Sequence, residues 1–147
     1  MNDTMTGGCQ CGAVRFTVQI HDDDAYLCHC RMCQRAIGNV SVAFKTVLKA
    51  EVSWKGEPAW YASSVIAKRP FCPACGTPLG FAYNDSDRMD LNVGAFDDPG
   101  RFVPRSHFGI ETRLDQWLDT GGLPGYRLED HTATVDRWMN AIGKLPD

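Results

Sequence analysis

The stretch Cys28-His29-Cys30-Arg31-Met32-Cys33 contains three of the seven cysteines of this chain. The other four form two pairs, in Cys9-Gln10-Cys11 and in Cys72-Pro73-Ala74-Cys75. Structural zinc is almost always held by four protein ligands, whereas catalytic zinc commonly has three and leaves its fourth position to water or substrate. The two pairs therefore predict one closed structural site, and the group of three predicts a second metal with an open position.

The two pairs are expected to converge on a single structural zinc ion. A Cys-x-Cys pair on an extended segment can meet a Cys-x-x-Cys pair on a tight turn, and Gly76 permits the positive φ that such a turn often needs. Cys-Pro-Ala-Cys is also a redox motif of the thioredoxin type, but the residues after it do not read as the helix that this motif requires. The predicted ligands of the structural ion are Cys9, Cys11, Cys72 and Cys75.

The group of three cysteines is the candidate active site. These cysteines lie within six residues, so that one loop can surround a metal ion. His29 stands between two of them and is expected to point away from the ion. A histidine from elsewhere, His107 or His131, would close the site and make it structural.

The type of ligand narrows the reaction. Three thiolates donate much charge to zinc, so the ion should acidify a bound water less than it would with three histidines. A substrate thiol bound as a fourth sulfur would, in contrast, be held deprotonated near neutral pH. The ligand set therefore favours addition of a thiol to an electrophile over hydrolysis.

Length and composition predict one domain over residues 1–147, because the 147 residues are 44% hydrophobic. Residues 1–8 lack the features of a secretory signal, and no apolar segment is long enough to cross a bilayer, so a cytoplasmic location is expected. In a reducing compartment, metal binding explains clustered cysteines better than disulfides do. The alternative of a secreted disulfide scaffold also conflicts with the odd number of cysteines.

The charge of the chain argues against one class of partner. The formal net charge is -3 at pH 7, whereas nonspecific nucleic-acid binding draws its affinity from an excess of Lys and Arg. Local positive charge nevertheless lies beside the cysteine groups, where it could receive an anionic small molecule if the fold gathers it. The candidate side chains are Arg31, Arg35, Lys68 and Arg69.

Hydrophobic periodicity predicts a mainly β protein. Residues 14–20 alternate between apolar and polar side chains, which is typical of a strand with one buried face. A helix is indicated at 135–142, with Asp130 or Thr132 as its N-cap, and a shorter turn at 114–118. Many short strands separated by turns favour antiparallel sheets. The other expected strands are 40–44, 52–54, 60–62, 65–67, 79–83 and 91–93.

Five segments resemble the glutathione-dependent formaldehyde-activating enzyme family, which also includes centromere protein V. The resemblance covers about residues 7–126 and leaves 127–147 as a C-terminal extension. Three cysteine groups in this order and spacing are highly specific at the level of the family. The segments are GGCQCGAVRF (7–16), CHCRMCQRAIG (28–38), RPFCPACGTPL (69–79), DLNVGAFDDP (90–99) and QWL (116–118).

The resemblance implies a β-tent of antiparallel sheets braced by zinc, with a short C-terminal helix, and two zinc ions per chain. It implies the condensation of glutathione with formaldehyde to S-hydroxymethylglutathione, a carbon-sulfur lyase activity that serves formaldehyde detoxification. The basic residues named above would then receive the carboxylates of glutathione. The implied ligands are Cys28, Cys30 and Cys33 for the catalytic ion, and Cys9, Cys11, Cys72 and Cys75 for the structural ion.

Two other readings stay open. The chain could be a zinc-thiolate enzyme that acts on another thiol or electrophile, which a screen of thiols would decide. It could also be a binding module that is stabilised by zinc and has no catalytic activity, as the centromere relative suggests. The acidic chain has no Lys/Arg-rich tail for chromatin, so no nucleic-acid partner and no membrane partner is expected.

Overall fold

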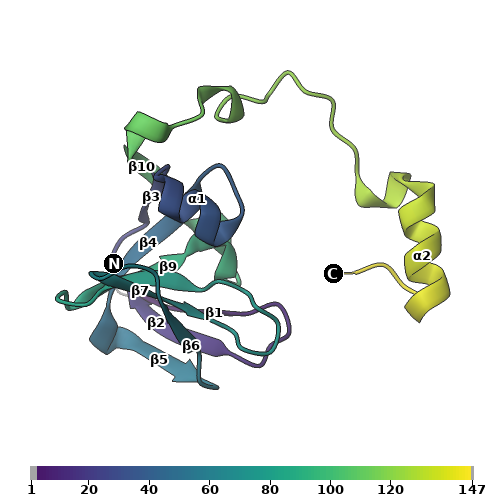
Figure 1. Cartoon of the computed structure of the whole chain (residues 1–147). Helices are drawn as coiled ribbons and strands as arrows, with labels where there is room; N and C mark the ends of the chain where they lie inside the picture. The colour runs from purple at the N-terminus through teal and green to yellow at the C-terminus, as the bar shows by residue number, and fades with distance from the viewer. Residues whose placement is uncertain (1–2, 147) are drawn as a thin grey trace. The chain divides into compact units, whose positions relative to one another are not determined.

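The computed structural model describes residues 3–146 and divides the chain into two compact units. The first covers residues 1–114 and contains every cysteine; the second covers 115–147. Figure 1 labels the principal strands and helices of both. The single catalytic domain expected over residues 1–147 stays a prediction.

The first unit is built from two sheets. The smaller sheet has the order β1-β2-β5, and the larger has the order β10-β3-β4-β9-β8-β7-β6. The strands are β1 (Asp3–Gly8), β2 (Arg15–Ile20), β3 (Asp24–Cys28), β4 (Val42–Leu48), β5 (Val52–Lys55), β6 (Ala59–Ala62), β7 (Ala67–Phe71), β8 (Gly80–Tyr83), β9 (Arg88–Asn92) and β10 (Val103–Phe108). The prediction of a mainly β fold is confirmed.

The core follows from the alternation of the strands. On β2, Phe16, Val18 and Ile20 are almost completely buried, whereas the residues between them face outward. They join one hydrophobic cluster with residues of the larger sheet, including Met89 and Leu91 of β9. Burial of each such side chain contributes about 1.5–3 kcal/mol, so this cluster is a main source of stability for the first unit.

Three strands were not predicted from the sequence. β1 is rich in threonine and glycine, β3 begins in an acidic loop, and β10 is exposed along its whole length. β10 also pairs with β3 in parallel, whereas every other strand pair of the described residues is antiparallel. An exposed edge strand carries no apolar alternation, because neither of its faces is buried.

One helix was also missed. α1 (Arg31–Ile37) has only seven residues and begins between two of the cysteines. The C-terminal helix α2 (Thr132–Ile142) is confirmed in the second unit. Short 3-10 turns complete the chain: η1 (Lys49–Glu51), η2 (Val93–Ala95), η3 (Pro99–Arg101), η4 (Ile110–Thr112), η5 (Asp115–Trp117) and η6 (Leu128–Asp130).

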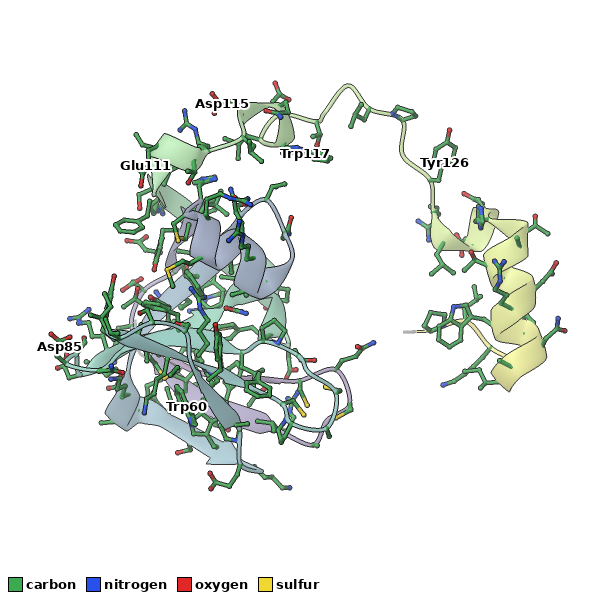
Figure 2. All side chains as sticks on the ribbon, viewed as in Figure 1. Trp60, Asp85, Glu111, Asp115, Trp117 and Tyr126 are labelled. Carbon is green, nitrogen blue, oxygen red and sulfur yellow. The ribbon has the colours of Figure 1, made fainter. Side chains whose placement is uncertain are left out.

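The second unit consists of η5, η6, α2 and the segments between them. Most of its large apolar side chains are exposed, as for Trp117 and Tyr126, which Figure 2 labels, whereas Val135 and Trp138 of α2 are partly buried. Within residues 3–146, no helix combines the length and apolar character needed to cross a membrane.

Candidate metal centres and the adjoining cavity

The sulfur atoms of Cys28, Cys30 and Cys33 form one group, in which all Sγ atoms lie within 4.8 Å of one another. Cys28 ends β3, Cys30 is the N-cap of α1, and Cys33 lies in the first turn of that helix. The Sγ atoms of Cys28 and Cys30 are 3.6 Å apart. A strand end followed at once by a helix start therefore brings three nearby cysteines together without a distant partner.

The thiol groups help to hold this local geometry. The Sγ of Cys30 accepts a hydrogen bond from the backbone N–H of Cys33 at 3.4 Å, which caps α1. The helix ends at Gly38, whose φ of 71° lies in the left-handed region and whose N–H donates to the carbonyl of Gln34. Gln34 in turn donates from its side chain to the carbonyls of Val40 and Thr112. These bonds fix α1 against the segment after β10.

His29 lies between two cysteines, yet its ring is directed elsewhere, in agreement with the sequence-based expectation. It is 1% exposed, and its Nε2 lies 2.8 Å from Nδ1 of His107 on β10. Among the described residues, neither His29 nor His107 contributes a ligand atom to the group of Cys28, Cys30 and Cys33. His131 belongs to the second unit, where its Nδ1 contacts the hydroxyl of Thr134 at 2.7 Å.

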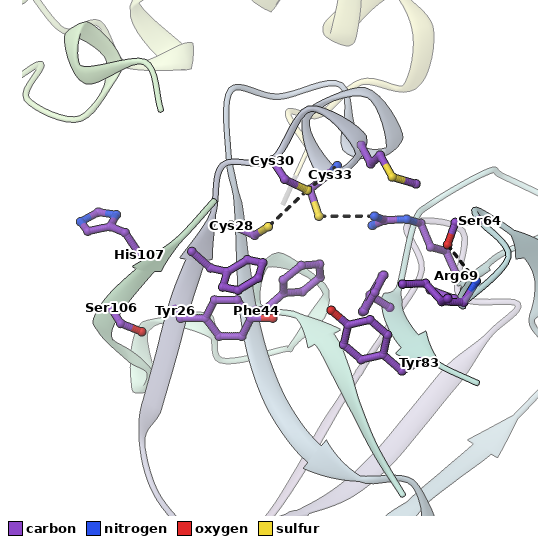
Figure 3. A pocket seen from close by; sticks show the side chains of 15 residues that line it. Tyr26, Cys28, Cys30, Cys33, Phe44, Ser64, Arg69, Tyr83, Ser106 and His107 are labelled. Atoms are coloured by element: carbon purple, nitrogen blue, oxygen red, sulfur yellow. Dashed lines mark hydrogen bonds between the residues drawn. The ribbon is translucent and has the colours of Figure 1, made fainter. Parts of the chain in front are cut away.

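Arg69 brings positive charge to the three sulfurs. This β7 residue is 5% exposed, and its Nη2 donates a hydrogen bond to Sγ of Cys33 at 3.3 Å, as Figure 3 shows. The guanidinium also lies over the ring of Phe81, 4.9 Å from its centroid. The hydrogen bond from Cys28 and the guanidinium of Arg69 lower the pKa of Cys33 to about 5. The thiolate on Cys33 and burial raise the pKa of Cys28 well above its ordinary value.

The three sulfurs open onto a cavity of about 450 Å³. Figure 3 shows the sulfurs on one side of this cavity and the rings of Tyr26, Phe44 and Tyr83 on another. Ser106 and His107 of β10 line it too, so the parallel edge strand supplies part of the wall. The cavity therefore combines a cluster of soft sulfur ligands with a mostly apolar surface that contains several aromatic rings.

The other four cysteines also come together. The Sγ atoms of Cys9, Cys11, Cys72 and Cys75 lie within 4.8 Å of one another, although Cys11 and Cys72 are 61 positions apart in the chain. Gly76 has a φ of 78°, and its N–H donates to the carbonyl of Cys72, which closes the tight turn. This turn is not the start of a helix, so the structural context of a thioredoxin-type redox motif is absent here among the described residues.

Hydrogen bonds stabilise thiolates in the four-sulfur group as well. The backbone N–H of Val14 donates to Sγ of Cys9 at 3.2 Å. The hydroxyl and the backbone N–H of Thr77 lower the pKa of Cys75 to about 5. Thiolates are the form in which cysteine binds metal, so these donors prepare the group for a cation.

Both groups fit zinc by their donor chemistry and spacing. A tetrahedral zinc ion with Zn–S bonds of about 2.3 Å separates its sulfur ligands by about 3.8 Å. The measured separations are 3.6 Å for Cys9 and Cys11, and 3.8 Å for Cys11 and Cys72. The three-sulfur group has a similar separation of 3.6 Å between Cys28 and Cys30.

The four basic candidates lie in different surroundings. Of these described side chains, Arg69 lines the cavity and the other three do not. Lys68 points to the opposite face of β7, with its Nζ 4.7 Å from the ring centroid of Trp60. Arg31 donates to the side chain of Gln34 on α1, and Arg35 lines an adjoining hollow to which Arg69 also contributes. The aromatic lining and the His29–His107 pair were not found from the sequence, because their residues are far apart in it.

A family model described as glutathione-dependent formaldehyde-activating enzyme matches residues 4–112 of the chain. The chain belongs to this family. A protein of Schizosaccharomyces pombe described as an uncharacterized lyase is 37% identical over 141 residues, which cover 94% of this chain and 96% of that protein. The crystal structure of a Rhodobacter sphaeroides protein matches with a TM-score of 0.55 at 23% identity, over 70% of this chain and 99% of its own. This last likeness supports the fold.

Proposed function

We propose that the chain is a zinc-dependent carbon-sulfur lyase that condenses a thiol with an aldehyde, with glutathione as the thiol and formaldehyde as the aldehyde. The observation that carries the proposal is the group of three sulfurs, without a fourth Cys, His, Asp or Glu ligand atom among the described residues, at the wall of a cavity. Membership of the formaldehyde-activating family and the lyase description of the Schizosaccharomyces pombe relative support it.

Cys28, Cys30 and Cys33 would hold the catalytic zinc ion, and their number leaves one position for a substrate. A zinc ion held by these residues would keep a substrate thiol deprotonated near neutral pH. The side chain of Arg69 offsets part of the negative charge of the cluster through its hydrogen bond to Cys33. An anionic thiol can therefore approach the site at a lower electrostatic cost.

Bond formation joins the thiol sulfur to the aldehyde carbon, and the electron pair of the carbonyl moves to its oxygen. That oxygen then takes up the proton that the thiol lost. His107 lines the cavity, but its ring is hydrogen-bonded to the buried His29 and points away from the three sulfurs in Figure 3. We therefore assign no side chain to the transfer of this proton.

The four-sulfur group has a structural role in this proposal. Cys9 and Cys11 follow β1, and Cys72 and Cys75 follow β7, so a zinc ion held there ties the small sheet to the large one. Such a link stabilises a small β unit by joining segments that are distant in the sequence.

Exchange spectroscopy by NMR tests the activity, because formaldehyde and glutathione also combine without a catalyst. The zinc-loaded chain should increase the rate of exchange between formaldehyde hydrate and S-hydroxymethylglutathione above the spontaneous rate, and a Cys30→Ser variant should not. An exchange rate equal to the spontaneous one with glutathione would contradict the proposal. A rate increase of equal size with cysteine or 2-mercaptoethanol would assign the activity to thiols in general.

A further inference from the structure

The cavity beside the three sulfurs is much larger and more apolar than formaldehyde requires. Its volume is about 450 Å³, whereas formaldehyde has two hydrogen atoms as its only substituents. The side chains of Phe44 and Ala67, both buried, form part of its wall together with the ring of Phe81. Ligand pockets lined in this way bind apolar groups and use a few polar side chains for orientation.

The polar end of Tyr26 is turned away from ligands. Its hydroxyl donates to the carboxylate of Asp90 at 2.9 Å, and Asp90 also accepts from the hydroxyl of Thr46 at 2.6 Å. Tyr26 therefore presents its ring to the cavity, next to the ring of Phe44 with a centroid distance of 5.6 Å. This arrangement suits contact with an apolar or aromatic group.

The rim of the same cavity is apolar and exposed. Met32, Ile66 and Phe108 line it, and their exposed fractions are 49%, 59% and 59%. Large apolar side chains gathered around an opening mark binding sites more often than scattered ones do. Glutathione carries two carboxylates, an ammonium group and two amides, so its polar parts suit the hollow lined by Arg35 and Arg69 better than this rim, which is left to an apolar group.

Arg69 can donate hydrogen bonds to a polar group of the ligand. Its Nη2 is engaged with Cys33, and its Nε and Nη1 have no hydrogen-bond partner among the described residues. The guanidinium is held in place by Phe81, so it offers a fixed donor direction toward the cavity wall. A ligand with one oxygen acceptor near the sulfurs and an apolar body beyond it fits these features.

We infer that the cavity receives an apolar, ring-sized substituent on the aldehyde carbon. On this inference, which rests on the proposed function, the substrates of the chain include larger aldehydes, such as aryl-substituted ones, in addition to formaldehyde. The thiol sulfur bonds to the carbonyl carbon, the carbonyl oxygen takes the thiol proton, and the substituent stays among the rings. No further reactant is needed.

The test compares two aldehydes with the zinc-loaded full chain and glutathione. NMR exchange spectroscopy should give a larger rate increase over the spontaneous reaction for phenylacetaldehyde than for formaldehyde. Calorimetry should also detect binding of 2-phenylethanol, which has the same ring but cannot react with a thiol. Because this binding needs no catalysis, it separates failure of the inference from failure of the proposed function.

Variants of rim residues, each paired with a control variant outside the cavity, test whether the rim contacts the ring. Ile66→Ser should lower the ratio of phenylacetaldehyde to formaldehyde rates and weaken binding of 2-phenylethanol, each by about fivefold to tenfold. Val65→Ser is its control, because Val65 is 96% exposed and does not line the cavity. Phe108→Ser and its control Ile110→Ser, two side chains of equal 59% exposure, form a second pair.

Three outcomes would overturn the inference. The first is acceleration with formaldehyde alone and no binding of 2-phenylethanol. The second is an equal response of Ile66→Ser and Val65→Ser. The third is that the chain accelerates the reaction of benzyl mercaptan with formaldehyde but not that of glutathione with phenylacetaldehyde. This result would mean that the cavity receives a ring carried by the thiol and not by the aldehyde. Absence of acceleration with both aldehydes, together with binding of 2-phenylethanol, would contradict the proposed function and leave the apolar site in place.

Discussion

Arg69 and Cys33 are joined by a hydrogen bond from Nη2 to Sγ of 3.3 Å, although they are 36 positions apart in the chain. The bond connects β7 to α1 and places a buried guanidinium next to a sulfur that we assign to the metal site. Groups that contact metal ligands in this way orient them and adjust their charge. Loss of this contact should therefore be visible in metal affinity.

We predict that Arg69→Met weakens metal binding at the three-sulfur group by about tenfold to a hundredfold. The variant removes both the N–H donor and the positive charge beside Cys33. Titration with cadmium, followed by thiolate-to-metal absorption in competition with a chelator, measures the change. Lys68→Met is the control, because it removes the same charge from the opposite face of the same strand. Equal affinity for both variants would contradict the role of Arg69.

The two sulfur groups should respond separately to mutation. In a Cys30→Ser variant, one zinc ion per chain should persist, the other should bind more weakly, and the fold should be retained. In a Cys72→Ser variant, stability should fall by about 4 kcal/mol when free zinc exceeds the dissociation constant a thousandfold, because Cys72 is fully buried in the group that links the sheets.

Metal analysis combined with urea unfolding distinguishes the two variants. Loss of both zinc ions from Cys30→Ser would mean that the cysteines are shared between the sites in another way.

Gly109 is predicted to be intolerant of any side chain. Its φ is 69°, and a Cβ atom there would lie 2.9 Å from the backbone nitrogen of Cys30. Gly109→Ala should cost about 2–4 kcal/mol, the sum of a left-handed backbone and a steric clash. Gly38→Ala should cost about 1 kcal/mol, since Gly38 has a similar φ of 71° and open space around it. Urea unfolding of both variants measures the difference, and equal losses would rule out the clash.

A pH-dependent contribution to stability is expected from Asp22. The Nζ of buried Lys45 donates to its carboxylate at 2.5 Å, which lowers the pKa of Asp22 below 3.8. A group with a lowered folded-state pKa contributes stability above its unfolded-state pKa and loses it as the pH falls through the folded-state value. This contribution should therefore be complete above about pH 5 and be lost progressively as the pH falls below 3.8 through the lowered folded-state pKa.

Asp22→Asn should lower stability at neutral pH by about 1–2 kcal/mol, because it leaves Lys45 buried with the carbonyl of Asp24 as an acceptor. The low figure reflects the 59% exposure of the Asp22 side chain, where solvent screens the pair. Urea unfolding between pH 7 and pH 3 should show the difference from the parent chain narrowing as the pH falls. Asp85→Asn, at an exposed carboxylate, is the control.

The sequence predicts those parts of the molecule whose information is local. The alternation of Phe16, Val18 and Ile20 identifies β2 because one face of the strand is buried. The cysteine spacing likewise indicates two groups of sulfurs, and the structure brings each of them together. The basic residues stay a prediction: Arg69 lines the cavity, and Arg35 lines an adjoining hollow together with it.

What the sequence does not reveal depends on contacts between distant segments. α1 is too short for a helical period, and it is defined by the cap at Cys30 and the left-handed Gly38. β10 is fully exposed and carries no alternation, so its parallel pairing with β3 cannot be read from its residues. The aromatic cavity takes its rings from β3, β4 and β8, which meet only in the folded sheet.

The late position of β10 in the chain has a consequence during synthesis on the ribosome. Ser106 follows Cys33 by 73 positions (106 minus 33). At typical elongation rates, roughly 4 to 15 seconds pass between synthesis of the three cysteines and synthesis of β10, which forms part of the cavity wall. The cysteines are therefore open to cellular oxidants and metal donors in that interval, and metallation competes with oxidative damage before the enzyme is complete.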